Sequence, residues 1–171
     1  MIEFEKIPAK SISYGGRRNL KDVEFIVIHY TGNKNDTARG NGLYFRCGNT
    51  REAGAHWFVD RDGIIVRSIP MTKTAWSVGG FFTGEHDAAM YYKRCINANS
   101  VSIELCSLTE WPSIPQQDAV RNLVEFIQKK CPNAKKIIRH WDVNGKQCPA
   151  SMCGKGNKVW LTFKQAIKTN A

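Results

Sequence analysis

A stretch of β-branched and aromatic residues, FIVI at positions 25–28, constrains the fold of this chain more than any other segment. It is followed by His29 and closed by Gly32. A strand that carries no polar side chain on either face must be covered on both faces, as strands in α/β sheets are. We therefore expect residues 22–32 to form a buried strand inside a sheet.

Four other segments also have the composition of strands. AHWFVD and IIVRSIP, about residues 55–60 and 64–69, flank the turn sequence RDG, which is typical of a hairpin. SVSIELCS alternates, so its apolar residues share one face while Glu104 lies on the other. The short segment KKIIRH is predicted to be a last strand, ending in His140.

Helical patterns separate these strands. SIPQQDAVRNLVEFIQKKCP has apolar residues at helical spacing and ends at Pro132. We expect a shorter helix from Asp36 or Thr37 to Cys47, a C-terminal helix over about 156–169, and short helical pieces in an irregular segment at 71–99. The order predicts one α/β domain spanning 1–171, with its core motifs at about 22–150 and a central mixed β-sheet flanked by helices.

The net charge of +10 favours an anionic partner, such as nucleic acid, lipid headgroups or an acidic cell-wall polymer. Because the basic residues are spread along the chain, we expect no nucleic acid. No segment is apolar enough to span a membrane, and the N-terminus lacks the pattern of a signal peptide. We expect synthesis in the cytoplasm, reduced cysteines and a monomer, although Cys148 and Cys153 are close enough in sequence to pair.

Two histidines stand where predicted strands end, and such positions display functional side chains in α/β sheets. His29 closes the first strand and His140 the last, and Cys148 follows in the loop GKQCP. Zinc binds imidazole and thiolate ligands tetrahedrally, and three protein ligands leave a fourth position for water. The pattern indicates a zinc site, although a strand-end histidine is also typical of hydrogen-bonded core positions.

Hydrolysis at such a site also needs a group that carries protons. Glu104 lies in the middle of an otherwise apolar strand, where a carboxylate is costly to bury without a partner or a task. We predict that it carries the proton, and that Lys146 stabilises the oxyanion formed during attack on an amide. The plainer alternatives are an exposed glutamate on an edge strand and a solvated loop lysine.

The segments VIHYTG, AHWFVDRDG, NSVSIEL and RHWDVNGKQCP occur in this order between residues 25 and 149. The set resembles the zinc-dependent N-acetylmuramoyl-L-alanine amidases of the type 2 family, which includes phage endolysins and shares its fold with peptidoglycan recognition proteins. The resemblance implies a Zn²⁺-dependent peptidoglycan hydrolase. Its reaction would cleave the amide between the lactyl group of N-acetylmuramic acid and the L-alanine of the stem peptide, and it would reach the cell wall after release from the cell.

Matched motif by motif, the resemblance assigns the zinc ligands His29, His140 and Cys148 and the catalytic residues Glu104 and Lys146. It also implies that residues near the substrate groove are His56, Trp57, Trp76 and Asn99. The chain departs from the family pattern at two positions. Ala55 stands where some members have a catalytic tyrosine, and Ser77 follows Trp76 where relatives commonly have histidine. His86 matches nothing in the pattern and is predicted to be a loop residue.

Two other functions remain open from the sequence. A domain of this kind can bind muropeptides without cutting them, although non-catalytic relatives lack a zinc ligand and this chain has all three. Alternatively, Cys148 is the nucleophile of a cysteine hydrolase, with His140 as its base. A cysteine hydrolase is distinguished from a zinc enzyme by inhibition, because thiol alkylation would stop the cysteine hydrolase while chelators would not.

Overall fold

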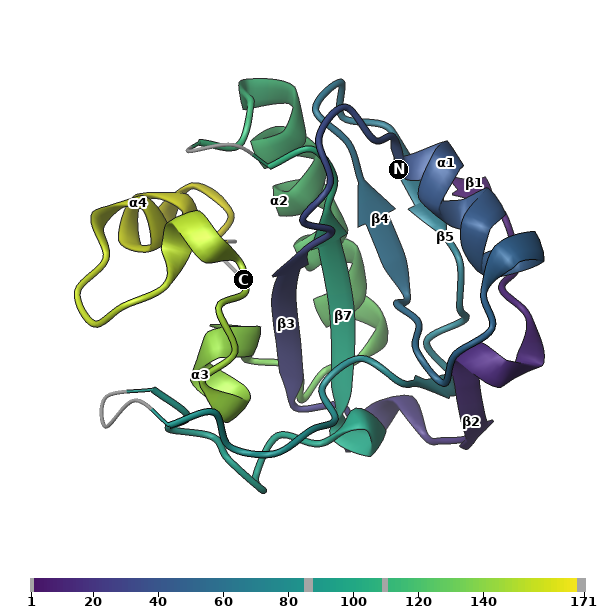
Figure 1. The fold of residues 1–171 in the computed structure, drawn as a ribbon, viewed down its shortest axis with the longest axis horizontal. Helices are drawn as coiled ribbons and strands as arrows, with labels where there is room; N and C mark the ends of the chain where they lie inside the picture. Colours follow the sequence, from purple (N-terminus) through teal and green to yellow (C-terminus); the bar gives the residue numbers. More distant parts are fainter. Residues whose placement is uncertain (1, 85–87, 109–110, 169–171) are drawn as a thin grey trace.

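The computed structural model describes residues 2–84, 88–108 and 111–168 and is built on a six-stranded mixed sheet (Figure 1). The strand order is β1-β5-β4-β7-β3-β8. These strands are β1 (Glu5–Lys6), β3 (Phe25–Tyr30), β4 (Trp57–Val59), β5 (Ile65–Arg67), β7 (Ser100–Leu105) and β8 (Lys136–Arg139). Strand β3 pairs in parallel with both β7 and β8, and β4 and β5 form the antiparallel hairpin. The expected mixed sheet flanked by helices is confirmed.

The two faces of the sheet are covered by different elements. On one face, Ile26 and Ile103 belong to a large apolar core that includes Leu123 of α2 (Ile114–Lys130) and Phe163 of α4 (Lys158–Ala166). On the other face, Phe25 packs in a smaller apolar cluster with Val78, Cys95 and Val143 of helix α3 (His140–Asn144). Strand β3 is therefore buried from both sides, as its apolar run predicts.

The structure corrects several element boundaries. His140 begins helix α3 instead of closing β8, and the helix expected at 37–47 is divided into α1 (Ala38–Leu43) and a π-helical turn (Tyr44–Gly48). Thr37 caps α1 by accepting a hydrogen bond from the backbone N–H of Gly40 at 3.0 Å. The segment at 71–99 contains a strand, β6 (Lys73–Ala75), and a 3-10 turn (Asn97–Asn99).

Short N-terminal elements were not predicted at all. Strand β1 has two residues, and β2 (Tyr14–Arg17) pairs with β6 in a separate two-stranded sheet. The remaining short turns are 3-10 helices at Ser11–Ser13, Leu20–Asp22 and Ala150–Met152. A strand of only a few residues shows no readable alternation of apolar and polar side chains. Such a strand is defined by its hydrogen bonds to a neighbouring strand, which the local sequence does not reveal.

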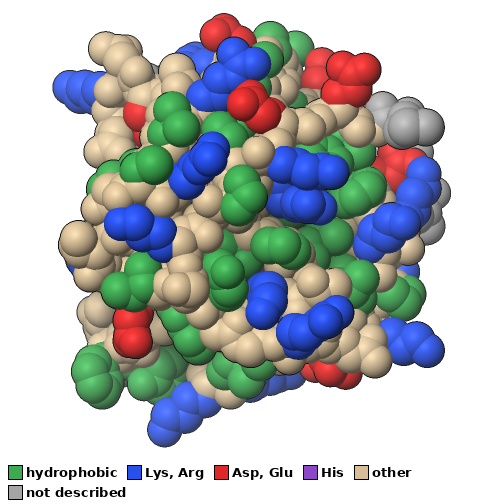
Figure 2. Space-filling model, turned by 90° about the vertical axis from the view of Figure 1, so that its right-hand side faces the viewer, with side chains coloured by type: hydrophobic (Ala, Val, Ile, Leu, Met, Phe, Trp, Pro, Cys, Tyr) green, Lys and Arg blue, Asp and Glu red, His purple; other side chains and the backbone are tan. Residues whose placement is uncertain are grey.

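The surface chemistry agrees with a scattered positive charge. On the face that lies at the β1 and α1 side, Lys and Arg side chains are dispersed among hydrophobic and uncharged ones (Figure 2). None of the described helices is long and apolar enough to cross a membrane. No disulfide links the six cysteines, all of which lie in the described residues. His86 lies outside the described residues.

Candidate active site

Strands β3 and β7 place a histidine and a carboxylate side by side. His29 and Glu104 are register partners on these parallel strands, so their side chains emerge on the same face. His29 Nδ1 lies 3.9 Å from Glu104 Oε1. Phe58 of β4 is the register partner of Glu104 on the other side. Glu104 therefore stands between an imidazole and a phenyl ring on the face opposite the α2 core.

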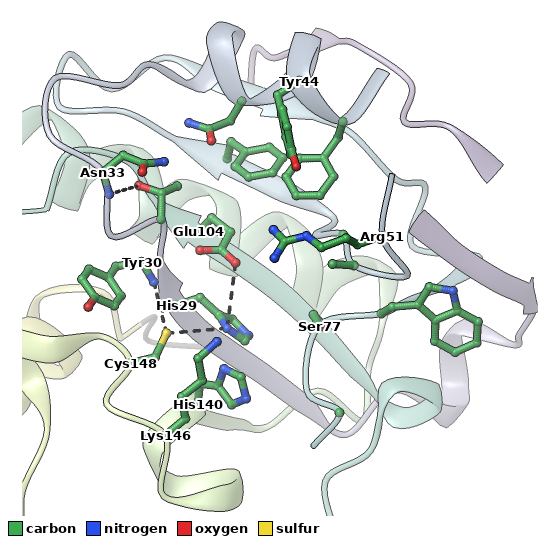
Figure 3. A pocket seen from close by; sticks show the side chains of 18 of the residues that line it. His29, Tyr30, Asn33, Tyr44, Arg51, Ser77, Glu104, His140, Lys146 and Cys148 are labelled. Atoms are coloured by element: carbon green, nitrogen blue, oxygen red, sulfur yellow. Dashed lines mark hydrogen bonds and ion pairs between the residues drawn. The ribbon is translucent and has the colours of Figure 1, made fainter. Parts of the chain in front are cut away.

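The segment after β8 brings two more ligand-type side chains to the same point. The rings of His29 and His140 have centroids 4.6 Å apart, and Cys148 Sγ lies 3.8 Å from His29 Nδ1. The backbone N–H of Tyr30 donates to Cys148 Sγ at 3.4 Å. Ligand atoms of His29, His140 and Cys148 all lie within 4.8 Å of one another (Figure 3). Residues separated by more than a hundred positions in the sequence therefore converge.

Backbone and side-chain hydrogen bonds fix the segment that carries His140 and Cys148. The N–H of Trp141 donates to the carbonyl of Cys148 at 2.9 Å, which closes the loop. Gly145 ends helix α3 with φ of 83°, a left-handed conformation that glycine adopts without strain. Arg139 forms an ion pair with Asp142 at 2.7 Å and also donates to the carbonyl of Gly154 at 3.1 Å.

Burial keeps the three proposed ligand side chains uncharged in the absence of a metal. Desolvation lowers the pKa of His29 well below its usual value, with the charge on Lys146 and the nearby His140 acting in the same direction. Desolvation likewise lowers the pKa of His140 to about 3. Burial and, secondarily, Glu104 raise the pKa of the Cys148 thiol. Neutral imidazoles are the form that binds metal ions, while the thiol has to lose its proton on binding.

Glu104 is tuned by two opposing influences. Desolvation raises the pKa of its carboxyl to about 7, and Asp36 adds to that rise while Lys146 opposes it. A carboxyl that titrates near neutral pH is able both to accept and to return a proton under working conditions. The arrangement therefore provides an acid/base group directly beside the ligand cluster.

Several polar atoms of this cluster lack hydrogen-bond partners among the described residues. Unpartnered buried atoms include Nε2 of His29, both ring nitrogens of His140 and Oε2 of Glu104. Buried polar groups are normally satisfied, because each one left without a partner costs free energy. Two imidazoles and a thiol are also the donor set that zinc prefers. The residues present thus fit a zinc ion.

The cluster opens into a cleft of about 1120 Å³. Trp76 and Ser77 line this cleft, and Arg51 and Lys146 extend into it from opposite walls (Figure 3). The ring of Trp76 lies across Gly15, where an added Cβ would stand 2.5 Å from the indole. Such an open cleft beside a buried cluster is suited to a large substrate with one bond placed at the cluster.

A comparison with protein families matches residues 19–151 of this chain to a family described as N-acetylmuramoyl-L-alanine amidase. The chain belongs to this amidase family. The matched range contains the residues of the cluster and its two charged neighbours, namely His29, Glu104, His140, Lys146 and Cys148.

Named relatives support membership of the amidase family. N-acetylmuramoyl-L-alanine amidase CwlL of Bacillus licheniformis is 28% identical over 86% of this chain and 41% of its own length. N-acetylmuramoyl-L-alanine amidase BlyA of Bacillus subtilis (strain 168) is 28% identical over 95% of this chain and 45% of its own length. The chain spans less than half the length of these two curated relatives.

Solved structures share the fold of this amidase-family chain. The catalytic domain of XlyA gives a TM-score of 0.74 at 17% identity, covering 98% of this chain and 100% of that one. PlyL gives a TM-score of 0.73 at 20% identity, covering 99% of each chain. At such low identity these similarities establish the fold, while the chemistry rests on the residues of this chain.

Three residues expected near the substrate do not line the cleft. His56 is fully buried, with Nδ1 3.0 Å from Ser102 Oγ. Trp57 points into the α2 core, where its ring packs 5.1 Å from that of Phe4. Both were expected near the groove because of the strand that carries them, but neither side chain lines the open cleft.

Asn99 does not line the cleft either, whereas the nearby Asn97 does. The side chain of Asn99 accepts from the N–H of Ile96 at 2.8 Å and so caps a local turn. Asn97 lines the cleft instead, and its Oδ1 accepts from the N–H groups of Ser77 and Val78. The sequence INANS offers two asparagines two residues apart, and only the turn that contains them decides which one faces the cleft.

Two further residues were missed by the sequence analysis. Arg51 lines the cleft but sits in an irregular segment with no pattern that distinguishes it from other surface arginines. Arg139 is buried between the rings of Trp141 and Trp160, at 4.4 and 5.2 Å from their centroids. The sequence does contain a pattern that indicates this buried ion pair. Arg139 ends an apolar run and stands three residues before Asp142.

Proposed function

We propose that this chain is a zinc-dependent N-acetylmuramoyl-L-alanine amidase that cuts the amide between the lactyl group of N-acetylmuramic acid and L-alanine in peptidoglycan. The observation that carries the proposal is the convergence of His29, His140 and Cys148 beside Glu104 in an open cleft. The family and the names of the relatives support the same bond and substrate. Its place of action would be the bacterial cell wall.

The metal would be held by His29, His140 and Cys148. Zinc bound there would polarise the scissile carbonyl and make an attacking water more acidic. The chain itself supplies the shell that keeps these ligands in place. The N–H of Tyr30 fixes the Cys148 sulfur, and the Arg139–Asp142 ion pair anchors the start of α3.

Glu104 performs the proton transfers. Its carboxylate accepts a proton from the attacking water and delivers it to the nitrogen of the departing L-alanine. Both steps need a carboxyl whose pKa lies near the working pH, and burial raises the pKa of Glu104 to about 7. Phe58 on one side and His29 on the other are the register partners of Glu104 and flank its carboxyl at the wall of the cleft.

Lys146 stabilises negative charge during the same reaction. It extends into the cleft from the loop that carries Cys148 (Figure 3), and its charge acts on His29, His140 and Glu104. A fixed ammonium group near the scissile carbonyl favours the tetrahedral oxyanion over the planar amide. Its two roles are then to hold the oxyanion and to limit the rise in the pKa of Glu104.

The two alternative functions are less well supported. A cysteine hydrolase needs a thiolate, whereas Cys148 is buried with its pKa raised. A non-catalytic binding module has no use for a buried carboxyl beside a complete ligand set, because burying that group without partners costs free energy.

Mass spectrometry of digested peptidoglycan tests the bond that is cut. The zinc-loaded chain should release stem peptides with a free N-terminal L-alanine and leave glycan strands that retain intact lactyl groups. The matched control is Glu104→Gln, which should release almost none. New reducing sugar ends, or cuts within the peptide, would reject an amidase of this specificity. Intact binding to peptidoglycan without products at any zinc concentration would favour the binding module.

A further inference from the structure

A second cleft, of about 410 Å³, lies along strand β8 and is rich in lysine. The strand is the last in the order of the main sheet, so one of its edges has no strand partner among the described residues. Half of the residues that line the cleft are lysines, namely Lys135, Lys136, Lys164 and Lys168. None of its lining residues is shared with the catalytic cleft, so it is a separate site.

Most of these lysines lack a nearby carboxylate. Lys136 lies 3.6 Å from Glu24 and above the ring of Phe25, at 5.0 Å from its centroid. Within the described ranges, no carboxylate lies within ion-pair distance of the other three lysines of the cleft. The cleft therefore concentrates four positive charges, of which only that of Lys136 is directly paired among the described residues.

Lys164 is the most constrained of these lysines. It is half-buried, and its ammonium lies 5.5 Å from the centroid of the Trp160 ring. Desolvation lowers its pKa, and the charges of Arg139 and Lys168 act in the same direction while Asp142 opposes them. Like charges held together on a partly buried surface repel one another, and a bound anion would relieve that repulsion.

The type of cation favours phosphate groups as the ligand. All the cations that line the cleft are lysines, and an ammonium acts as a point charge without the planar, two-pronged geometry by which arginine recognises carboxylates. Tyr91, Ile137 and Ile138 add an apolar component to the lining. Several separate ammonium groups suit a ligand that carries repeated single charges, such as a chain of phosphodiesters.

We propose that this lysine cleft binds a phosphate-bearing anionic polymer of the bacterial cell wall and so holds the protein on the surface that its catalytic cleft acts on. The choice of the wall as the source of the polymer rests on the proposed amidase function. The net charge of +10 fits the same partner, since it attracts polyanions before the cleft engages one.

Direct binding measurements on the zinc-loaded full chain test this proposal. The probe is a poly(glycerol phosphate) polymer purified from bacterial walls, and its affinity is measured by calorimetry at low salt. The test variant is Lys135→Gln/Lys164→Gln/Lys168→Gln. The matched control is Lys6→Gln/Lys10→Gln/Arg46→Gln, which removes the same charge from exposed side chains around β1, at the opposite edge of the sheet.

The expected result is a loss of affinity of about tenfold or more for the cleft variant, with a much smaller loss for the control. The slope of log affinity against log salt should also become shallower only in the cleft variant. If Lys164→Gln impairs folding, as judged by thermal unfolding, the double variant Lys135→Gln/Lys168→Gln affects only exposed side chains and should show a smaller loss in the same direction.

Three results would overturn the proposal. These are no binding of the polymer by the unmodified chain, equal losses in the cleft and control variants, and tighter binding of single-stranded DNA at the same phosphate concentration. The last result would assign the cleft to nucleic acid. Because binding is measured without peptidoglycan, any of these outcomes leaves the amidase proposal intact, and failure of the amidase test leaves this binding result intact.

Discussion

The two faces of the main sheet differ sharply at the same pair of strands. Ile28 and Ile103 are register partners whose side chains lie in the dry core beneath α2. His29 and Glu104, one position further along, are also register partners but lie on the opposite face, beside the cleft. Successive side chains of a strand point to opposite faces of the sheet, so one residue packs in the core while its neighbour lies at the site.

This difference shows how a rigid site is obtained. The apolar side chains on the core face fix the relative position of β3 and β7, and the polar side chains on the cleft face inherit that position. The cleft face contains buried polar atoms without hydrogen-bond partners, which lower the stability of the folded chain. Changes on the two faces should therefore affect different measurements.

The largest expected effect is on activity and comes from the cleft face. Glu104→Gln should lower amide hydrolysis about 100- to 10,000-fold, because a positioned acid/base group contributes a factor of that size. Zinc content should be unchanged, and the free energy of unfolding should be equal or higher because a buried carboxyl is removed. Kinetics with metal analysis on the same sample measure both. An active Glu104→Gln chain would remove the carboxyl from the mechanism.

Lys146→Met should have a smaller effect on the same face. We expect hydrolysis to fall about 100- to 1,000-fold, since the loss of one oxyanion donor has an effect of that order. Lys146 lowers the pKa of Glu104, so its removal should also move the acidic limb of the pH–rate profile to higher pH. If the profile stays in place and the rate is nearly unchanged, Lys146 is a solvated loop lysine.

On the core face, Ile103→Ala should change stability and leave the chemistry in place. Its side chain is fully buried, and removal of such a side chain lowers the free energy of unfolding by about 2–5 kcal/mol. Denaturant unfolding measures the loss, and activity below the transition serves as the control. If Ile103→Ala reduced activity as much as Glu104→Gln, the separation between the two faces would be lost.

The pH dependence of stability gives a further effect, of a few kcal/mol at most. Burial, with Arg18 second, lowers the pKa of His56 from 6.5 to about 3. Between these two pH values the unfolded chain binds a proton at His56 and the folded chain does not. The contribution of His56 to the free energy of unfolding is therefore fully present above pH 6.5 and is lost as the pH falls toward about 3. Titration of the zinc-loaded protein by NMR should find His56 neutral at pH 5. A His56 signal that titrates near 6.5 would contradict this assignment.

Much of the fold could be predicted because its signals are local. The apolar run of β3, the alternation in β7 and the helical spacing of α2 each lie within a single segment, and each is found where expected. The strands β1 and β2 could not be predicted, since a few residues without alternation become strands only through their distant partners.

In the candidate site, the clustered residues could be predicted from the sequence, whereas the other residues that line the cleft could be predicted only in part. The sequence order of His29, Glu104, His140 and Cys148 suggested a cluster, and the structure brings these residues together. The substrate-facing residues depended on side-chain direction, which local patterns did not provide. His56 is therefore buried and does not line the cleft, and Asn97 lines the cleft where Asn99 was expected.

The central claim is that His29, His140 and Cys148 hold a zinc ion on which amide hydrolysis depends. The most direct test is to remove metal from the protein by chelation and then add zinc back while measuring bound zinc and released stem peptides together. We predict no release from the metal-free chain and a rise in proportion to bound zinc, up to about one ion per chain. Full release from the metal-free chain, or loss of activity on thiol alkylation but not on chelation, would contradict the account.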